Sequence, residues 1–216
     1  MQRRFALLAL PFLFALTAAG HPARRAAPRP VPLGDLVRVV MVTDQGTIEL
    51  ELDHKHAPIT VKNFVRYVDT RRFDGAVFYR VMRLKWGEQP NGLIQAGLQG
   101  NAARLLPPIA HEPTSLTGLK HVTGAISMAR NAPGTARADF TIMMSPLEGL
   151  DADPTSTDPD RQAGFAVFGR VTTGMDIARK IYDRPLSETK GQGVMRGQIL
   201  EVPVKILSMR RLPATN

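Results

Sequence analysis

The sequence has no cysteine among its 216 residues, and aromatic residues make up only 6% of it, with a single tryptophan. The absence of thiols excludes disulfide frameworks, thiol nucleophiles, thiolate zinc sites and a lipid anchor on an N-terminal cysteine. No apolar run reaches the length of a bilayer span. Apolar residues still form 44% of the chain, too many for a disordered protein. The composition therefore indicates one globular domain, or at most two small ones.

Acidic residues are outnumbered, since 19 Asp and Glu face 28 Lys and Arg and leave a formal charge of +9. A basic balance of this size suggests nucleic acid or an anionic membrane surface as a partner. The basic residues are scattered, however, in doublets such as Arg71-Arg72, and no aromatic-rich strand accompanies them. We therefore expect no nucleic-acid binding. Attachment of a basic protein to anionic surfaces is therefore our least favoured functional hypothesis.

The first twenty residues have the pattern of a secretory signal peptide. A positive head with Arg3 and Arg4 precedes an apolar run over residues 5–16. Small residues follow, and we expect cleavage between Ala18 and Gly20. The apolar run has about fifteen residues, short of the roughly twenty of a spanning helix, so an uncleaved anchor is the weaker alternative. The sequence predicts an exported, periplasmic protein with a mature charge of +7 and no membrane span after cleavage.

Residues 21–34 contain four prolines and no periodic apolar pattern, which is typical of an extended linker. The rest of the chain, residues 35–216, is predicted to form one domain. Alternating apolar and polar residues predict short strands in it, as where Ile48, Leu50 and Leu52 alternate with polar neighbours. The predicted strands are residues 37–43, 47–52, 77–82, 93–96, 124–128, 140–144 and 165–171, with a final strand pair within residues 199–209.

Only two segments have helical periodicity. Apolar positions repeat as i, i+3, i+4 and i+7 from Val61 to Val68, which predicts a helix with Thr60 as its N-cap. A second helix is predicted near residues 175–182. Many short strands, two helices and no alternation of strands with helices indicate a mainly β fold, either a closed antiparallel barrel or a sandwich.

Familiar catalytic and cofactor-binding motifs are missing from the sequence. It has no phosphate-binding lysine loop, nucleophile-elbow serine or metalloprotease helix, and the glycines of residues 191–197 have the wrong spacing for a dinucleotide turn. His54 and His56 lack a third ligand at a suitable spacing, and the Asp-rich residues 151–160 lack the glycine and glutamate of a calcium loop. We therefore expect neither a metal site nor a cofactor.

Four segments instead occur in an order that is typical of one family. They are residues 78–81 (Phe-Tyr-Arg-Val), 93–97 (Leu-Ile-Gln-Ala-Gly), 124–130 (Gly-Ala-Ile-Ser-Met-Ala-Arg) and 164–171 (Gly-Phe-Ala-Val-Phe-Gly-Arg-Val). On these segments the chain resembles the cyclophilin-type peptidyl-prolyl cis-trans isomerases from about residue 37 to residue 212. The resemblance implies a closed eight-stranded antiparallel barrel capped by two α-helices, in agreement with the pattern of strands.

The resemblance also implies a site for rotating X-Pro bonds. Rotation crosses a barrier of about 20 kcal/mol without making or breaking a bond, so an apolar pocket and well-placed hydrogen bonds suffice for catalysis. Arg80 takes the role of the catalytic donor to the prolyl nitrogen or the carbonyl oxygen, and Gln95 hydrogen-bonds the substrate backbone. The implied substrate-binding residues are Leu93, Met128, Ala129, Arg130, Asp139, Phe140 and Phe165.

The sequence departs from the family pattern around this pocket. Gly92 and Thr141 stand where the family usually has phenylalanines, and Phe165 stands where a histidine is common. Residues 83–91 lengthen the link between the Arg80 and Gln95 strands, and their Trp86 either folds over the site or stays exposed. Phe165 is expected to restore apolar surface. These differences lead us to expect weak cyclosporin binding and are compatible with a low isomerase turnover.

The leading prediction is a monomeric, cofactor-free isomerase that accelerates the folding of exported proteins by acting on proline-containing polypeptides. The alternative is a catalytically weak module on the same fold, which binds proline peptides or acts as a chaperone. An isomerase assay separates the two, because only the first reading predicts that refolding limited by proline isomerisation is accelerated.

Overall fold

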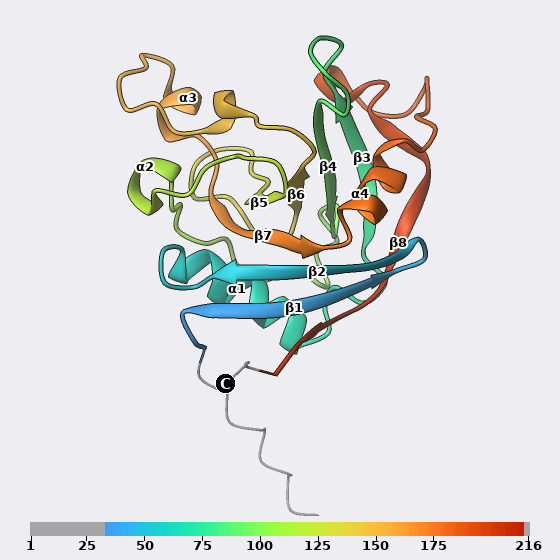
Figure 1. The fold of residues 1–216 in the computed structure, drawn as a ribbon. Coiled ribbons are helices and arrows are strands. Elements are labelled where there is room, and N and C mark those ends of the chain that lie inside the picture. The colour runs from blue at the N-terminus through green and yellow to red at the C-terminus, as the bar shows by residue number, and fades with distance from the viewer. Residues whose placement is uncertain (1–32, 214–216) are drawn as a thin grey trace, which may run out of the picture. The chain divides into compact units, whose positions relative to one another are not determined.

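A closed barrel of eight antiparallel strands forms the domain in the computed structural model, which describes residues 33–213 (Figure 1). Its strands are β1 (Leu36–Thr43), β2 (Gly46–Asp53), β3 (Val77–Arg83), β4 (Gly92–Gly97), β5 (Ala125–Met128), β6 (Phe140–Met143), β7 (Val167–Thr173) and β8 (Ile199–Arg211). Around the barrel they follow the order β1-β2-β7-β5-β6-β4-β3-β8. The predicted eight-stranded barrel is confirmed. The predicted signal peptide, residues 1–20, lies outside the described residues, as does the linker as far as residue 32.

The β1–β2 hairpin shows how the alternating sequence pattern becomes a half-buried sheet. Ile48, Leu50 and Leu52 are at most 1% exposed, whereas Glu49 and Glu51 between them are half-buried. Asp44 and Gln45 form the two-residue turn, since Thr43 pairs with Gly46. Side chains at every second position of β2 therefore contribute to the barrel core.

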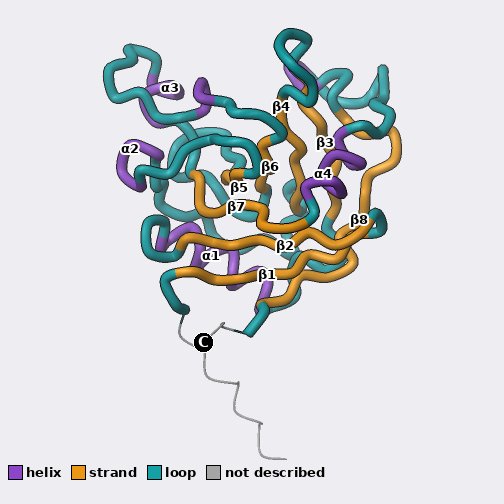
Figure 2. The backbone as a smooth tube through the Cα atoms, viewed as in Figure 1, coloured by secondary structure: helices purple, strands orange, loops and turns teal. Residues whose placement is uncertain are grey.

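In the described part of the chain, residues 33–213, four α-helices accompany the strands, where the sequence predicted two (Figure 2). α1 (Pro58–Asp69) and α4 (Met175–Tyr182) are the predicted pair, and both bury apolar side chains in the barrel core. The additional helices α2 (Thr114–Thr117) and α3 (Pro159–Ala163) are four and five residues long, too short to show a 3.6-residue period in the sequence. Within residues 33–213, no helix is long and apolar enough to cross a membrane.

Glu112, and not the predicted Thr60, caps the N-terminus of α1. Helix α1 begins at Pro58, so Thr60 lies inside its first turn and is fully buried. The Glu112 carboxylate accepts hydrogen bonds from the backbone N–H groups of Ile59 and Thr60 at 3.0 and 2.7 Å, and from the Thr60 hydroxyl at 2.6 Å. A carboxylate from a distant segment thus satisfies the free amides and the positive end of the helix dipole.

β8 is one continuous strand, which corrects the predicted strand pair. Its first half pairs with β3 and its second half pairs with β1, so this single strand closes the barrel. Glu201, Val202 and Pro203 are exposed in succession, and Pro203 has no N–H to donate. Because these three residues break the alternation of buried and exposed positions, the sequence pattern predicted two strands here instead of one.

The few aromatic residues of the chain concentrate in the barrel core. We call Phe64, Phe73, Phe78, Phe140 and Phe168 the aromatic cluster, and each of them is at most 1% exposed. The ring of Phe64 on α1 lies 4.9 Å from that of Phe73, 5.3 Å from that of Phe140 and 5.1 Å from that of Phe168, measured between centroids. Helix α1 is therefore fixed to strands β6 and β7 by ring packing.

Candidate active site

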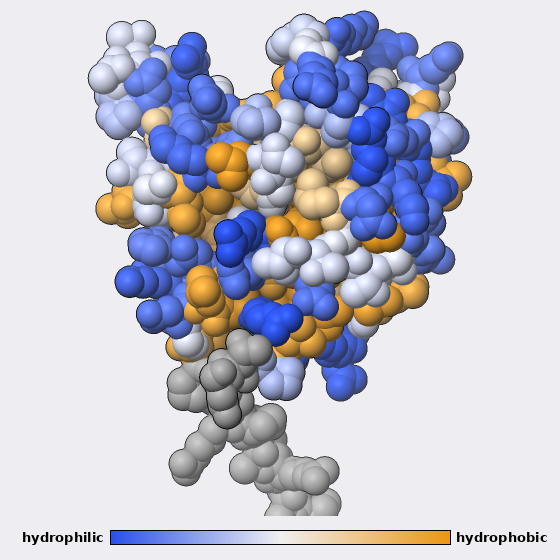
Figure 3. Space-filling view, viewed as in Figure 1, coloured by the Kyte–Doolittle hydropathy of each residue, from blue (hydrophilic) through white to orange (hydrophobic). Residues whose placement is uncertain are grey.

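A cavity of about 770 Å³ opens on the outer side of strands β3, β4, β5 and β6. The surface is hollowed between the region of α3 and the β3–β4 loop (Figure 3). Eight of the nine site residues predicted from the sequence line the cavity, namely Arg80, Leu93, Gln95, Met128, Ala129, Arg130, Asp139 and Phe165. The structure therefore brings together residues that lie up to 85 positions apart in the sequence.

Phe140 is the predicted site residue that does not line the cavity. Its side chain is fully buried in the aromatic cluster, where it meets Phe64 edge to face. Successive side chains of a strand point to opposite faces, so Asp139 and Thr141 border the cavity while Phe140 turns into the core. The prediction that Phe140 forms pocket surface is corrected by this alternation.

A row of polar side chains crosses four neighbouring strands at the cavity. Arg80 on β3 pairs with Gln95 on β4, Gln95 pairs with Thr141 on β6, and Thr141 pairs with Ser127 on β5. Paired residues of antiparallel strands point to the same face, and all four residues line the cavity. The register of the barrel therefore builds the polar part of the site.

A β-bulge at Tyr79 adds a fifth polar group to this site. The β3–β4 register shifts between Phe78 and Arg80, so Tyr79 is the extra residue. Without the bulge, consecutive residues would face opposite sides of the sheet, but here both Tyr79 and Arg80 line the cavity. Sequence reasoning missed Tyr79 as a site residue, although it belongs to the Phe-Tyr-Arg-Val segment, because period-two alternation directs it away from Arg80.

Two amide oxygens hold the Arg80 guanidinium. Arg80 Nη1 donates to Gln95 Oε1 and Arg80 Nε donates to Gln198 Oε1, both at 2.9 Å. Burial lowers the pKa of Arg80, yet a guanidinium keeps its charge at physiological pH. These two contacts use two of the five N–H donors of the group. The others remain to serve a bound carbonyl oxygen or prolyl nitrogen.

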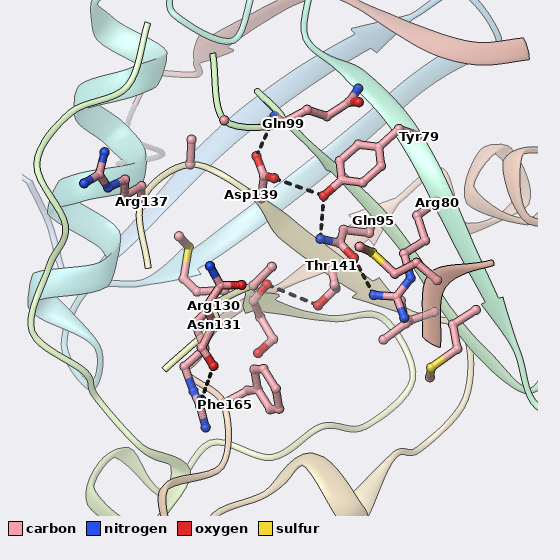
Figure 4. A pocket seen from close by; sticks show the side chains of 18 of the residues that line it. Tyr79, Arg80, Gln95, Gln99, Arg130, Asn131, Arg137, Asp139, Thr141 and Phe165 are labelled. Carbon is pink, nitrogen blue, oxygen red and sulfur yellow. Dashed lines mark hydrogen bonds between the residues drawn. The ribbon is translucent and has the colours of Figure 1, made fainter. Parts of the chain in front are cut away.

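A chain of hydrogen bonds runs from Arg80 to a carboxylate (Figure 4). Gln95 Nε2 donates to Tyr79 Oη at 2.6 Å, and Tyr79 Oη donates to Asp139 Oδ2 at 3.0 Å. Burial, followed by the nearby Asp139 charge, raises the pKa of Tyr79, so its hydroxyl stays protonated. Asp139 Oδ1 accepts from the backbone N–H of Leu98 at 2.7 Å. The donors all point from the cation toward the anion, which fixes the orientation of the Gln95 amide.

Phe165, supported by the Arg130 side chain, forms an apolar wall of the cavity. The Arg130 guanidinium carbon lies 4.6 Å from the centroid of the Phe165 ring. Arg130 Nη2 donates to the carbonyl oxygen of Gly164 at 2.7 Å, and Nη1 pairs with Asp160 at 2.9 Å. Only 2% of the Arg130 side chain is exposed, so its charge is neutralised locally and supports the aromatic ring. Leu93, which is 5% exposed, adds further apolar surface, whereas Met128 pairs with Phe140 and packs in the core although it borders the cavity.

Comparisons with known proteins agree with this geometry. A family model described as cyclophilin type peptidyl-prolyl cis-trans isomerase/CLD matches residues 38–210. The peptidyl-prolyl cis-trans isomerase of Acinetobacter baylyi is 36% identical over 176 residues, which cover 80% of this chain and 84% of that relative. Peptidyl-prolyl cis-trans isomerase A of Dickeya dadantii is 36% identical over 149 residues, which cover 66% of this chain and 70% of the relative.

The chain belongs to the cyclophilin-type peptidyl-prolyl cis-trans isomerases. A crystal structure of such an isomerase from Cryptosporidium parvum, determined in the presence of the dipeptide Ala-Pro, has the same fold. Its TM-score is 0.64 at 18% identity, over 82% of this chain and 99% of that one. The polar row and the apolar wall therefore lie on a cyclophilin barrel and belong to an isomerase.

The departures of this cyclophilin from the family pattern have structural causes. Gly92 is buried with φ of 142°, and a Cβ there would lie 1.9 Å from the carbonyl oxygen of Met82, so no side chain fits. Thr141 turns its hydroxyl to the carbonyl oxygen of Ser127 at 3.2 Å. Trp86 is 68% exposed and is absent from the cavity lining. Among residues 33–213, Phe165 and Tyr79 are thus the only aromatic residues that line the cavity.

Ser127, His121 and Asp151 form a second hydrogen-bonded network at the edge of the cavity. His121 Nε2 lies 2.9 Å from Ser127 Oγ, and His121 Nδ1 lies 2.7 Å from Asp151 Oδ1. The distances suit a hydrolytic triad, but Ser127 is 1% exposed and its hydroxyl is directed to His121. In this cyclophilin the network ties the loop at Asp151 to β5 and offers no accessible nucleophile.

Proposed function

We propose that this isomerase accelerates X-Pro rotation during the folding of exported proteins, and that Arg80 supplies the catalytic hydrogen bonds. The observation that carries the proposal is the Arg80 guanidinium, held by Gln95 and Gln198 in a cavity with an apolar wall. Isomerisation requires loss of amide resonance and no covalent chemistry. A charged group with fixed donors that favours the twisted amide over the planar one is therefore sufficient.

In this proposal the apolar side of the cavity binds the proline ring, and the polar side donates hydrogen bonds to the X-Pro amide. The proline ring is expected to rest against Phe165 and Leu93, where its burial releases water. Arg80 is then able to donate to the prolyl nitrogen as that atom regains its lone pair, or to the carbonyl oxygen before it. Gln95 already donates one N–H to Tyr79, and its second N–H is left for the substrate backbone.

Proline-containing polypeptides are the proposed substrates. The related cyclophilin from Cryptosporidium parvum was crystallised in the presence of Ala-Pro, which supports a prolyl ligand for this cavity. Export to the periplasm rests on the signal-like pattern of residues 1–20. We propose that the protein acts there as a monomer, since one barrel supplies all the proposed catalytic and binding residues.

Refolding of a protein limited by proline isomerisation tests the activity. We expect the wild type to accelerate the slow phase and Arg80→Ala to lose about 100-fold of the catalytic rate, because a preorganised charged donor is removed. Arg170→Ala is the matched control, since Arg170 lies on β7 and forms an exposed pair with Glu51. No acceleration by the wild type would contradict the proposed activity, and equal acceleration by wild type and Arg80→Ala would contradict the role of Arg80.

The alternative of a weakly catalytic proline-binding module has two observations in its favour. Thr141 places a hydroxyl among the apolar lining residues, and Gln95 has committed half of its amide donors to Tyr79. That reading predicts binding of a proline peptide by titration calorimetry without acceleration of refolding. Export is tested separately, by N-terminal sequencing of the protein recovered from the periplasm, where an intact Met1 would contradict cleavage.

A further inference from the structure

Gln198 is the second acceptor for the Arg80 guanidinium, and it comes from a part of the chain far from the predicted site. It immediately precedes β8 and lies 118 residues after Arg80. Its Oε1 accepts from Arg80 Nε at 2.9 Å, while Gln95 accepts from Nη1. Acceptors on two different nitrogens fix both the position and the plane of a guanidinium, whereas one acceptor leaves the group free to rotate.

Gln198 is itself held in place by the loop that precedes it. Its side-chain Nε2 donates to the carbonyl oxygen of Val194 at 2.8 Å, and its backbone N–H donates to the carbonyl oxygen of Met195 at 3.0 Å. The Gln198 carbonyl oxygen accepts from the backbone N–H of Val81 at 2.8 Å. The loop of residues 191–198 is therefore fastened to β3 directly beside Arg80.

The same loop borders the cavity. Gly191 and Met195 contribute to the cavity lining, Met195 is 38% exposed and Val194 is 84% exposed. A polypeptide that extends from the cavity past Arg80 on this side meets these apolar side chains. Met195 and Gly191 are thus placed at the cavity, whereas Gln192 does not line it, and the loop is coupled through Gln198 to the guanidinium.

We propose that Gln198 is a positioning residue for Arg80, which orients the free N–H donors toward the twisted X-Pro amide; this inference rests on the proposed catalytic role of Arg80. Arginine has a long, flexible side chain, so a second contact restricts it before the substrate binds. Such preorganisation lowers the barrier more than it strengthens ground-state binding. The signature of this role is a change in kcat without a matching change in KM.

The kinetic test compares two glutamines of one loop in the full chain. Gln198→Ala is expected to lower kcat about tenfold and to change KM less than about twofold. Gln192→Ala is the matched control, because Gln192 is exposed and its side chain forms no hydrogen bond within residues 33–213. An equal kcat for the two variants, or a Gln198→Ala loss confined to KM, would overturn the proposal.

Gln198→Glu separates the contact with Arg80 from the contact with Val194. A glutamate still accepts from Arg80 Nε but has no N–H to donate to Val194. We expect Gln198→Glu to keep kcat within about threefold of the wild type, as charge-assisted hydrogen bonds are strong. A loss as large as that of Gln198→Ala would show that Gln198 serves only the structure of its loop, and would overturn the proposal.

Exchange of the Arg80 Nε–H proton, measured by NMR, gives a readout that is independent of catalysis. We expect slow exchange with water in the wild type and in Gln192→Ala, and faster exchange in Gln198→Ala. Unchanged exchange in Gln198→Ala would overturn the positioning role even in an active enzyme. A wild type with slow exchange but no isomerase activity would instead contradict the proposed function.

Discussion

The two faces of strand β6 place opposite demands on the residues that occupy them. On the inner face, Phe140 is enclosed by the rings of Phe64, Phe73 and Phe78. On the outer face, Thr141 lies at the cavity together with Asp139, which immediately precedes the strand, and both make directed hydrogen bonds. The inner face depends on volume and close packing, whereas the outer face depends on which donor meets which acceptor.

This difference explains how one barrel combines a stable scaffold with an adjustable site. Residues that face the core share their contacts with many neighbours, so a change of size disturbs several elements at once. Residues that face the cavity have fewer partners, and each partner has a defined chemical role. We therefore expect core substitutions to change stability and cavity substitutions to change activity.

Phe140→Ala should have the largest effect on stability. It removes a fully buried ring from the centre of the aromatic cluster, and the free energy of unfolding should fall by about 3–5 kcal/mol. Thr141→Ser, at the next position of β6, should lower it by less than about 1 kcal/mol because the hydroxyl is retained. Urea unfolding of both variants measures the contrast. Similar losses in the free energy of unfolding for the two variants would show that the two faces of β6 contribute equally to stability.

Gly92→Ala tests whether the backbone excludes a side chain beside the cavity. The new Cβ would meet the Met82 carbonyl oxygen at 1.9 Å, so we expect a loss of about 3 kcal/mol or more. Gly134→Ala is the control, since Gly134 also has positive φ but has no atom within 4 Å of the added Cβ. The strain of positive φ alone costs about 1 kcal/mol. Equal thermal stability of the two variants would show that β3 yields to the added group.

The fold and the outer-face residues follow from the sequence better than the contacts between them do. Alternation marked the strands, and the family resemblance led to Arg80 and Gln95. The same resemblance assigned Phe140 to the pocket, although the alternation between Asp139 and Thr141 turns it into the core. A face can be predicted from local pattern, because its period of two is a property of the strand itself.

Contacts that depend on distant segments or on irregular backbone could not be predicted. Tyr79 reaches the cavity only because of a bulge in β3, and a bulge leaves no clear trace in the alternation. Gln198 meets Arg80 because β8 pairs with β3, across 118 residues of sequence. Glu112 caps α1 from another segment and displaces the local candidate Thr60. Each of these partners is selected by tertiary structure.

Tyr79→Phe should change activity with little change in stability. The variant keeps the ring but removes the hydroxyl between Gln95 and Asp139, so the Gln95 amide loses its fixed orientation. We expect kcat to fall about three- to tenfold and the free energy of unfolding to fall by about 1 kcal/mol. Tyr182→Phe is the control, because its hydroxyl bonds Asn91 at 3.0 Å, away from the cavity. An unchanged kcat in Tyr79→Phe would show that the Tyr79 hydroxyl has no role in catalysis.

His121 is an exception to the contrast between buried apolar residues and polar cavity residues, because it is buried and yet makes directed hydrogen bonds. Its substitution should therefore affect the pH dependence of stability. Burial lowers its pKa, although the hydrogen bond with Asp151 opposes this, so the folded state favours the neutral imidazole. The unfolded chain binds the proton more readily, and the stability gained from neutral His121 is complete above the ordinary histidine pKa and is lost as the pH falls below it.

Thermal unfolding between pH 7.5 and pH 5.5 measures this effect, with His121→Gln as the comparison. Glutamine retains polar contacts toward Ser127 and Asp151 but does not titrate in this range. The wild type should lose more stability on acidification than the variant does. Lys120 lies 3.4 Å from Asp151 and is present in both proteins, so its contribution cancels in the comparison. If the thermal stability of the two proteins fell in parallel with pH, protonation of His121 would not be coupled to unfolding.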